Sequence, residues 1–498
     1  MAQQLVYKVR DLSGGAQMKV GDFLVGRDEF RRLVNFNLDT IGEITKVTGY
    51  SLRGNEVDGL SSILGASAFY YPGNQKQIMV GDNGVSSEGY IFDPSTDTWT
   101  AQSLSLTSGA KAEFCSYLGG LFMVNYSDAT RFYDGTTWSI ETNVTSAPKA
   151  RYITAMLDRV YLLNLEDNGS KVQASSLAAE DYTITWDTGA TGPNFLVSPK
   201  DGEDIMGGGV NSYRLLIFKE STLWLYDLTN LIRVPGAPGT NSHRSIVNVG
   251  KHTLYFHKTG VYDLVGNDSV LVSRSVQEII DGVQAGQLGD ICAYNKGDHY
   301  VCYLGDIYNA DTNLAIERCV IDYDVALRKW RIGSLAHSPL VFNTYRDDRS
   351  DLTYDEADYE YDYVDKNYDS LVSASDNVFF GDNSGVVYTL DNSQTYSGTT
   401  INAFFETPNY FPTGGTTEAI YRQVYVYTNS RRLRLYYSID DLVWLPLNKY
   451  EHKNGYIIYH FPPQTISNRI RFKGVDSSSG KKVAIKGWDI VYSPQPLN

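Results

Sequence analysis

Cysteine is scarce in this chain, and the scarcity excludes a scaffold held together by disulfides. The 498 residues contain four cysteines, and none of them belongs to a Cys-x-x-Cys pair. Four cysteines are too few to build a disulfide framework in a chain of this length. We therefore expect buried free thiols, in a protein made in a reducing cytoplasm, at Cys115, Cys292, Cys302 and Cys319.

Long hydrophobic runs are also missing. No stretch approaches the roughly 18 consecutive apolar residues that a membrane-spanning helix needs. Residues 1–8 lack the charged-then-apolar pattern of a signal peptide. The sequence predicts neither a membrane span nor an export signal.

The motifs of common enzyme classes are absent as well. The chain has no Gly-x-Ser-x-Gly nucleophile elbow and no Gly-x-x-x-x-Gly-Lys phosphate loop. It has seven histidines, and the closest pair, His252 and His257, is five residues apart in strand-like sequence. That spacing places the two side chains on opposite faces of a strand, which disfavours a shared metal ion. We expect no catalysis, no cofactor and no metal.

Charged residues make up only 20% of the chain, and acidic ones dominate. The formal net charge is −15 and the isoelectric point is near 5.0. Such a balance argues against a protein that grips nucleic acid with its whole surface. It leaves open a protein past which DNA moves without being held.

Tyrosine and glycine are what the chain has in abundance. There are 38 tyrosines and 44 glycines. Tyrosine, valine and threonine favour strands, and glycine supplies the turns between them. The composition predicts an all-β protein with extensive, half-exposed sheet.

One short unit recurs along the middle of the chain. Residues 90–99 read as a strand, a turn at Asp93 and a second strand that opens on Trp99. Residues 132–138 and 320–330 repeat the pattern. Asp turns a chain because its side chain bonds the backbone ahead, and repeats about 40 residues apart are typical of propeller blades. We predict an irregular β-propeller of six or seven blades, the last one partial.

Three parts follow from this periodicity. Residues 1–54 are an N-terminal lead-in and assembly segment, 55–395 the β-propeller, and 396–498 a β-sandwich whose strands alternate polar and apolar side chains and are denser in Lys and Arg. Within the lead-in, residues 27–35 predict a short helix and residues 38–50 a hairpin that turns at Gly42.

An acidic insertion interrupts the propeller at residues 346–369, where five tyrosines separate ten carboxylates. Three interpretations remain open: a solvated insertion, a docking strip for a basic partner, and a calcium or magnesium site, although the Asp-x-Asp-x-Asp-Gly calcium loop is absent. The candidate docking residues are Asp347, Asp348, Asp351, Asp355, Glu356, Asp358, Glu360 and Asp362.

Propellers also host glycosidases and adaptor modules. A glycan-cleaving or receptor-binding protein needs converging carboxylates at the channel mouth, for which Asp201, Glu203 and Asp204 are candidates. A kelch-type adaptor needs a regular Gly-Gly doublet in each blade, and the doublets at 119–120 and 207–209 do not recur regularly. Both alternatives stay open beside a purely structural role.

Both ends of the chain resemble one family. Residues 11–15 (Asp-Leu-Ser-Gly-Gly), 35–39 and 42–50 resemble the opening of the tail-hub or nozzle propeller proteins of tailed phages. Residues 434–446, followed by 468–472, are similar to the sandwich that often ends those chains, with Asp441 where the family pattern has glycine.

This resemblance implies a structural virion protein without catalysis. Its subunits would form a homo-oligomeric ring, commonly six-fold, in the head-to-tail connector below the portal and adaptor rings, and contact distal tail proteins. Genome DNA would pass through the lumen without sequence-specific binding. The acidic composition fits a conduit that repels phosphates, so we expect a lumen lined mainly by Asp, Glu and uncharged polar residues, in a part assembled in the host cytoplasm.

Overall fold

The computed structural model is an all-β protein, as the sequence predicts. Among the residues that the structure describes, the one α-helix is α1 (Gln277–Ile280), and short 3-10 turns are η2 (His243–Ser245), η3 (Ser273–Val276) and η4 (Ala285–Asp290). The structure describes residues 4–19, 24–38, 41–71, 74–117, 119–179, 183–186, 193–312, 314–346, 376–391, 393–453, 455–479 and 482–495. The acidic insertion predicted at 346–369 lies, apart from Arg346, outside the described residues.

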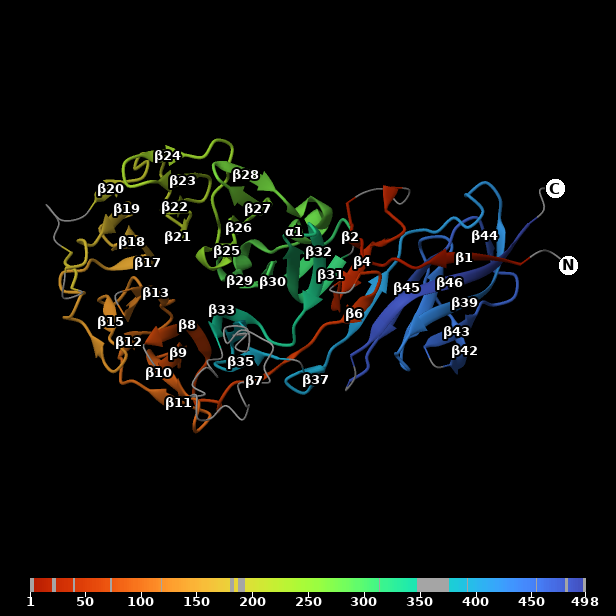
Figure 1. Ribbon diagram of the computed structural model, residues 1–498, viewed down its shortest axis with the longest axis horizontal. Helices are drawn as coiled ribbons and strands as arrows, with labels where there is room; N and C mark the ends of the chain where they lie inside the picture. The colour runs from red at the N-terminus through yellow and green to blue at the C-terminus, as the bar shows by residue number, and fades with distance from the viewer. Residues whose placement is uncertain are drawn as a thin grey trace, which may run out of the picture.

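Six blades are each built from four consecutive strands, arranged in a ring (Figure 1). The first blade comprises β8 (Ser62–Tyr71), β9 (Asn74–Asp82), β10 (Ser86–Asp93) and β11 (Thr98–Ala101), with β12 (Leu106–Thr107) beside β10. The second comprises β13 (Glu113–Tyr117), β14 (Gly120–Val124), β15 (Arg131–Tyr133) and β16 (Trp138–Ser139). The third comprises β17 (Ala150–Met156), β18 (Arg159–Leu165), β19 (Asn168–Ala174) and β20 (Asn194–Leu196).

The next three blades follow the same antiparallel order. The fourth comprises β21 (Gly207–Asn211), β22 (Arg214–Phe218), β23 (Leu223–Tyr226) and β24 (Leu231–Arg233). The fifth comprises β25 (Val247–Val249), β26 (His252–His257), β27 (Gly260–Val265) and β28 (Asp268–Leu271). The sixth comprises β29 (Cys292–Lys296), β30 (His299–Asn309), β31 (Leu314–Asp324) and β32 (Lys329–Ser334).

A composite sheet closes the ring between the sixth blade and the first. Its strands β33 (Pro339–Arg346), β34 (Asp376–Asp382) and β35 (Val387–Leu390) are completed by β7 (Tyr50–Leu52) from the lead-in, with β36 (Thr395–Tyr396) and β37 (Thr399–Thr400) beyond it. Strand β33 packs against β29 on one side and β8 on the other. This sheet is the partial last unit that the sequence predicts, and the N-terminal strand completes it.

The recurring strand–turn–Trp units join the third and fourth strands of their blades. In the first blade Phe92 pairs with Trp99 across β10 and β11, and Asp93 Oδ1 accepts hydrogen bonds from the backbone N–H (2.9 Å) and hydroxyl (2.7 Å) of Ser95. Trp99 Nε1 donates to the carbonyl of Arg53 at 2.8 Å. The indole thus covers the hairpin end and ties it to the lead-in.

The lead-in contradicts the predicted helix. Residues 27–35 form the strands β3 (Glu29–Phe30) and β4 (Arg32–Val34) instead. The backbone of β4 pairs with β32 on one side and with β38 (Ala403–Glu406) on the other, and Asn35 follows with a φ of 60° that a helix cannot contain. Partners distant in sequence therefore override the local helical preference.

The predicted hairpin with its turn at Gly42 is present, but its first strand lies before residue 38 and its second ends at Lys46. Strands β5 (Phe36–Asn37) and β6 (Ile44–Lys46) pair in antiparallel fashion, and Gly42 lies between them with a φ of 84°. The remaining short lead-in strands are β1 (Leu5–Val9), which pairs with the last strand of the chain, and β2 (Gly15–Ala16), which runs parallel to β3.

The C-terminal part forms two facing sheets together with lead-in strands. One contains β42 (Asn448–Lys453), β43 (Tyr456–His460), β39 (Ala419–Thr428), β46 (Ala484–Pro494), β6 and β5, with β1 beside β46 and β44 (Ile466–Ser467) beside β39. The other continues the sixth blade through β4 into β38, β45 (Arg471–Asp476), β40 (Arg434–Ser438) and β41 (Leu445–Pro446), as one nine-stranded sheet.

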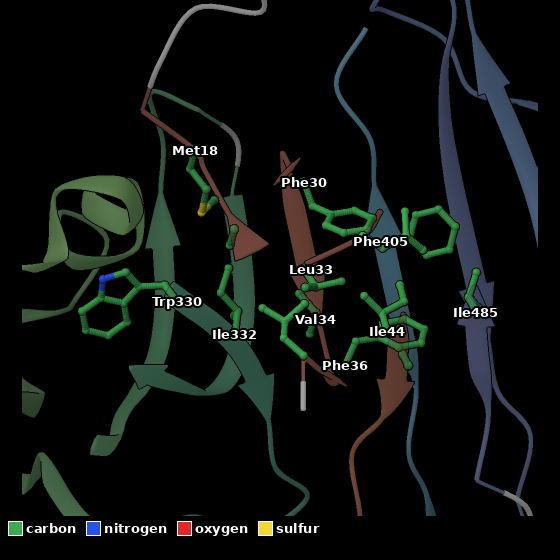
Figure 2. Packing of buried hydrophobic residues seen from close by; sticks show 14 of the residues in the cluster. Met18, Phe30, Leu33, Val34, Phe36, Ile44, Trp330, Ile332, Phe405 and Ile485 are labelled. Atoms are coloured by element: carbon green, nitrogen blue, oxygen red, sulfur yellow. The ribbon is translucent and has the colours of Figure 1, made fainter. Parts of the chain in front are cut away.

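A continuous apolar core joins propeller and sandwich. Figure 2 shows Leu33 and Val34 of the lead-in between Ile332 of the sixth blade and Phe405 of the sandwich. Phe405 stacks on Trp488 from the opposite sheet, with ring centroids 5.6 Å apart and planes 2° from parallel. Because burial of such side chains drives association of the sheets, the two parts share one hydrophobic core.

The thiols are free, as the sequence predicts. Cys292, Cys302 and Cys319 are buried and Cys115 is half-buried. Burial raises the pKa of the Cys302 thiol to about 12, so it stays protonated and unreactive at neutral pH. Among the described residues, no helix has the length and apolar character to cross a membrane.

Candidate functional site

A polar site lies on the propeller axis, where the first strands of the blades converge. There a pocket of about 420 Å³ opens between the second blade and the loop that leads from the fourth blade to the fifth. Its side chains carry both signs of charge and two aromatic faces. The main lining residues are Lys111, Glu113, Tyr126, Arg151, Tyr152 and His243.

Arg244 reaches from η2 across the axis and pins four segments together. Its guanidinium donates to Glu113 Oε1 at 2.8 Å and to the carbonyl oxygens of Leu340 (2.8 Å), Leu64 (2.6 Å) and Ala112 (3.1 Å). These partners belong to the closing sheet, the first blade and the start of the second. The side chain is nearly buried. The axis of the propeller is therefore occupied by a structural ion pair, and nothing as wide as a DNA duplex passes through it.

His243 lies beside this ion pair, with its ring largely buried. Its Nδ1 accepts a hydrogen bond from the backbone N–H of Gly208 at 3.3 Å, and its ring contacts Tyr152 with centroids 4.6 Å apart. Burial lowers the pKa of His243, although Glu113, whose Oε2 is 3.8 Å from Nε2, opposes that shift. The neutral imidazole and the arginine-bound carboxylate form a packed, polar wall.

The two cations at the rim of the pocket, Lys111 and Arg151, have different partners. Lys111 Nζ bonds Asp290 Oδ1 at 2.7 Å, whereas the Arg151 guanidinium lies over the ring of Tyr126, 4.8 Å from its centroid. Cations with an aromatic face suit the binding of a polar or anionic ligand better than acid–base chemistry.

The carboxylates named for a glycosidase mouth lie elsewhere. Asp201 binds Lys219 Nζ at 2.7 and 2.9 Å through its two oxygens, and the same ammonium donates to the backbone carbonyl of Glu203 at 2.8 Å. Burial alone would raise the pKa of Asp201, but the bonds from Lys219 and the Glu203 amide outweigh it and lower the pKa. Asp201, Glu203 and Asp204 are not among the residues that line the axial pocket.

The two histidines considered for a metal site have separate partners. His252 Nδ1 is 2.8 Å from Asp263 Oδ2, and His257 Nδ1 is 2.7 Å from Thr259 Oγ1. Within the described part of the chain, no group of three or more His, Cys, Asp or Glu side chains is arranged to hold a metal ion.

A second pocket, which the sequence did not suggest, lies where the sixth blade meets the lead-in. It measures about 270 Å³ and contains a polar network. Arg331 donates to Asp322 Oδ2 at 2.6 Å and to Asn37 Oδ1 at 3.1 Å, and His299 Nδ1 lies 2.8 Å from Asp322 Oδ1. The pairing of β30, β31 and β32 brings His299, Asp322 and Arg331 together, so no local pattern in the sequence marked this site.

The sandwich carries a third hollow, the basic groove, defined by Arg431, Arg432, Arg434 and Lys449. Its volume is about 600 Å³. Among the described residues, none of these four cations forms an ion pair with a carboxylate. Residues 396–498 hold 12 Lys and Arg against seven Asp and Glu, so this part is positive in a chain whose net charge is −15. The sequence noted the density of cations here but did not bring these four together.

The acidic docking residues between Asp347 and Asp362 lie outside the described residues, so their predicted role stays a prediction. No protein-family model and no curated protein sequence matches the chain.

Solved structures are similar in their propeller fold only. One is Ycf48 bound to a D1 peptide, at 9% identity and a TM-score of 0.40, covering 69% of this chain and 97% of that one. Another is a protein from Lactobacillus plantarum, at 14% identity and a TM-score of 0.37, covering 67% and 92%. A third is PorZ of the type-IX secretion system of Porphyromonas gingivalis, at 12% identity and 0.37, covering 74% and 44%.

Proposed function

We propose that this chain is a structural virion protein of a tailed phage, which forms an oligomeric ring in the head-to-tail connector or tail nozzle. The ring extends the DNA channel below the portal and adaptor rings. The observation that carries the proposal is the fusion of propeller and sandwich through one nine-stranded sheet and a shared core. A part that transmits load between neighbouring rings needs its two lobes to be joined by a shared sheet and core.

The filled propeller axis is compatible with this role because the proposed DNA channel lies between copies of the chain and not within one copy. Arg244 and Glu113 close the axis of each propeller. A ring of copies would enclose a wider lumen bounded by their outer surfaces. An acidic surface there repels the phosphates and lets DNA slide, whereas a basic one would hold it.

The charge distribution gives the copies complementary surfaces. The C-terminal part is positive, and the rest of the chain carries the excess of acidic residues. Complementary patches at different places on one molecule favour head-to-tail contacts, and these close into rings when the rotation permits.

Native mass spectrometry and negative-stain imaging of the purified protein, alone and with portal-ring particles, test the proposal. We expect a closed ring, or a monomer that forms one on the portal complex. A stable monomer that ignores portal complexes would count against it, and so would an assembled ring with a lumen lined mainly by Lys and Arg.

A second candidate function is receptor or glycan binding by a tail protein. The axial pocket of about 420 Å³, with Arg151 stacked on Tyr126 beside Tyr152, favours it. An array of glycans tested with the intact protein and with the Arg151→Ala variant distinguishes this role, since binding through the pocket would be lost in the variant.

A further inference from the structure

The basic groove lies where the chain crosses from one sheet of the sandwich to the other. Arg434 begins β40, and Lys449 is near the start of β42; the connection passes through Pro446 and Leu447. Lys449 Nζ donates to the backbone carbonyl of Arg431 at 2.9 Å, so the ammonium is held over the same hollow. Both β41 and β42 stand at the ends of their sheets.

Four like charges that have no acidic partner within the described ranges repel one another, and this arrangement is stabilised when an anion binds. Arg431, Arg432, Arg434 and Lys449 are all exposed. The guanidinium forks of arginine are suited to carboxylates and phosphates. The charges of the groove therefore favour an anionic partner.

The floor of the groove is apolar. Leu433, Leu435, Leu447 and Tyr459 line it, and the hydroxyl of Tyr459 donates to the carbonyl of Leu433 at 2.5 Å. Leu445, next to Pro446 in β41, is 43% exposed. A partner that brings aromatic side chains together with carboxylates would satisfy both the rim and the floor, whereas a phosphate backbone would satisfy only the rim.

One segment of the chain has this composition. Residues 347–369 contain ten carboxylates against two basic residues, Arg349 and Lys366, and five tyrosines. Residues 359–363 alternate strictly, Tyr-Glu-Tyr-Asp-Tyr. In an extended chain, alternation places the rings on one side and the carboxylates on the other. The segment departs from Arg346 at the end of β33 and returns at Asp376, the start of β34.

We propose that the basic groove of one copy binds the acidic segment 347–369 of the neighbouring copy. This inference rests on the proposed ring, because a contact between two different surfaces is what links successive subunits head to tail. Carboxylates of the segment pair with the groove arginines, and its tyrosines pack on the exposed Leu445 beside the groove. The contact is electrostatic at its rim, so it weakens as salt rises.

Binding of a fluorescent synthetic peptide of residues 347–369 to the full-length chain, followed by anisotropy, tests the contact without a ring. The receiving chain carries Asn and Gln at its own segment carboxylates, so that its groove is free. Arg431→Glu with Arg434→Glu should weaken binding at least about tenfold. Lys482→Glu with Lys486→Glu, two exposed lysines of the same sandwich outside the groove, changes the charge equally and should have an effect below about twofold.

Equal losses in both variants, or equal binding of a scrambled peptide, would overturn the inference. So would a DNA duplex that binds the groove more tightly than the peptide and displaces it, since the groove would then be a nucleic-acid site. Circular dichroism and thermal unfolding confirm that the variants are folded.

A mixing experiment establishes that the contact joins two copies. A chain with the reversed groove and a chain with the neutralised segment each lack one half of the contact. Mixed, they should form a one-to-one dimer, which neither forms alone. A mixture that stays monomeric would overturn the contact between copies. If the wild type forms a ring on the portal and the variant with the reversed groove also forms it, this inference fails while the proposed function stands. If the groove binds the peptide but the wild type forms no ring, the groove–segment contact stands while the proposed function fails.

Discussion

Lys46 Nζ lies 3.3 Å from Asp476 Oδ1, and neither side chain reaches solvent. Lys46 belongs to β6 in one sheet of the sandwich, and Asp476 ends β45 in the other. The ammonium also donates to the carbonyl of Ser478 at 2.7 Å, and the Ser430 hydroxyl donates to the carboxylate. A lead-in of 54 residues is thus fastened to the C-terminal sheets by a buried ion pair.

Breaking this pair should destabilise the protein strongly. Asp476→Asn or Lys46→Met alone leaves one charge buried without its partner, and each should lower the free energy of unfolding by about 3–5 kcal/mol. Urea unfolding followed by circular dichroism measures the loss. The double variant Lys46→Met/Asp476→Asn should lose clearly less than the sum of the two single losses, because no charge stays behind. An additive double variant would show that the two groups are not coupled.

Arg244 should contribute more to stability than any other cation at the axial pocket. Arg244→Met leaves Glu113 and the carbonyls of Leu64 and Leu340 without their donor, and should cost about 3 kcal/mol. Thermal unfolding monitors the effect. The control is Arg151→Met on the same pocket, which is exposed and should change stability by less than about 0.5 kcal/mol. Similar losses in both variants would contradict the pinning role.

Three histidines should make the protein less stable as the pH falls from 7.5 to 5.5. Burial lowers the pKa of His243, His257 and His337 below the 6.5 of an unfolded chain. Between the lowered value and 6.5 the unfolded chain binds more protons, so the free energy of unfolding decreases as the solution becomes more acidic, by up to about 1.4 kcal/mol per pH unit for each histidine.

Nearby charges modulate that shift without reversing it. Glu113, Glu220 and Asp382 oppose it at His243, His257 and His337, respectively. Urea unfolding at several pH values measures the slope, and replacement of the three histidines by Gln should flatten it. An unchanged slope in that triple variant would assign the effect to other groups.

Substitution of the tryptophans in the first two repeated units should lower stability by different amounts. Trp99→Phe removes the donor to the Arg53 carbonyl and part of a well-buried ring, at a cost of about 1–3 kcal/mol. Trp138 occupies the equivalent place in the second blade, but its buried Nε1 has no hydrogen-bond partner among the described residues. Trp138→Phe should therefore cost less than about 1 kcal/mol, and a larger loss than for Trp99→Phe would contradict this reading of the two sites.

Local chemistry was sufficient to predict the blades. Asp93 and Trp99 mark a strand–turn–strand unit because an Asx turn and a cross-strand aromatic pair involve neighbours only a few residues apart. The same holds for the hairpin at Gly42 and for the alternating strands of the sandwich. Asp441 stands where the phage-family pattern has glycine, and its backbone takes a φ of 68°, which Asp tolerates. Its carboxylate forms ion pairs with Arg469 and Arg471.

Only the tertiary structure decided the rest, because the contacts involved join residues hundreds of positions apart. The segment before Asn35 looks helical by itself, yet β4 is a strand because Ile332 and Phe405 flank its backbone. The Arg244–Glu113 pin, the Lys46–Asp476 pair and the basic groove likewise leave no local pattern, since each depends on where distant strands meet. The sequence alone determined that the chain repeats strand and turn; the closure of the ring by β7, and its fusion to the sandwich, came from long-range strand pairing and burial of a common core.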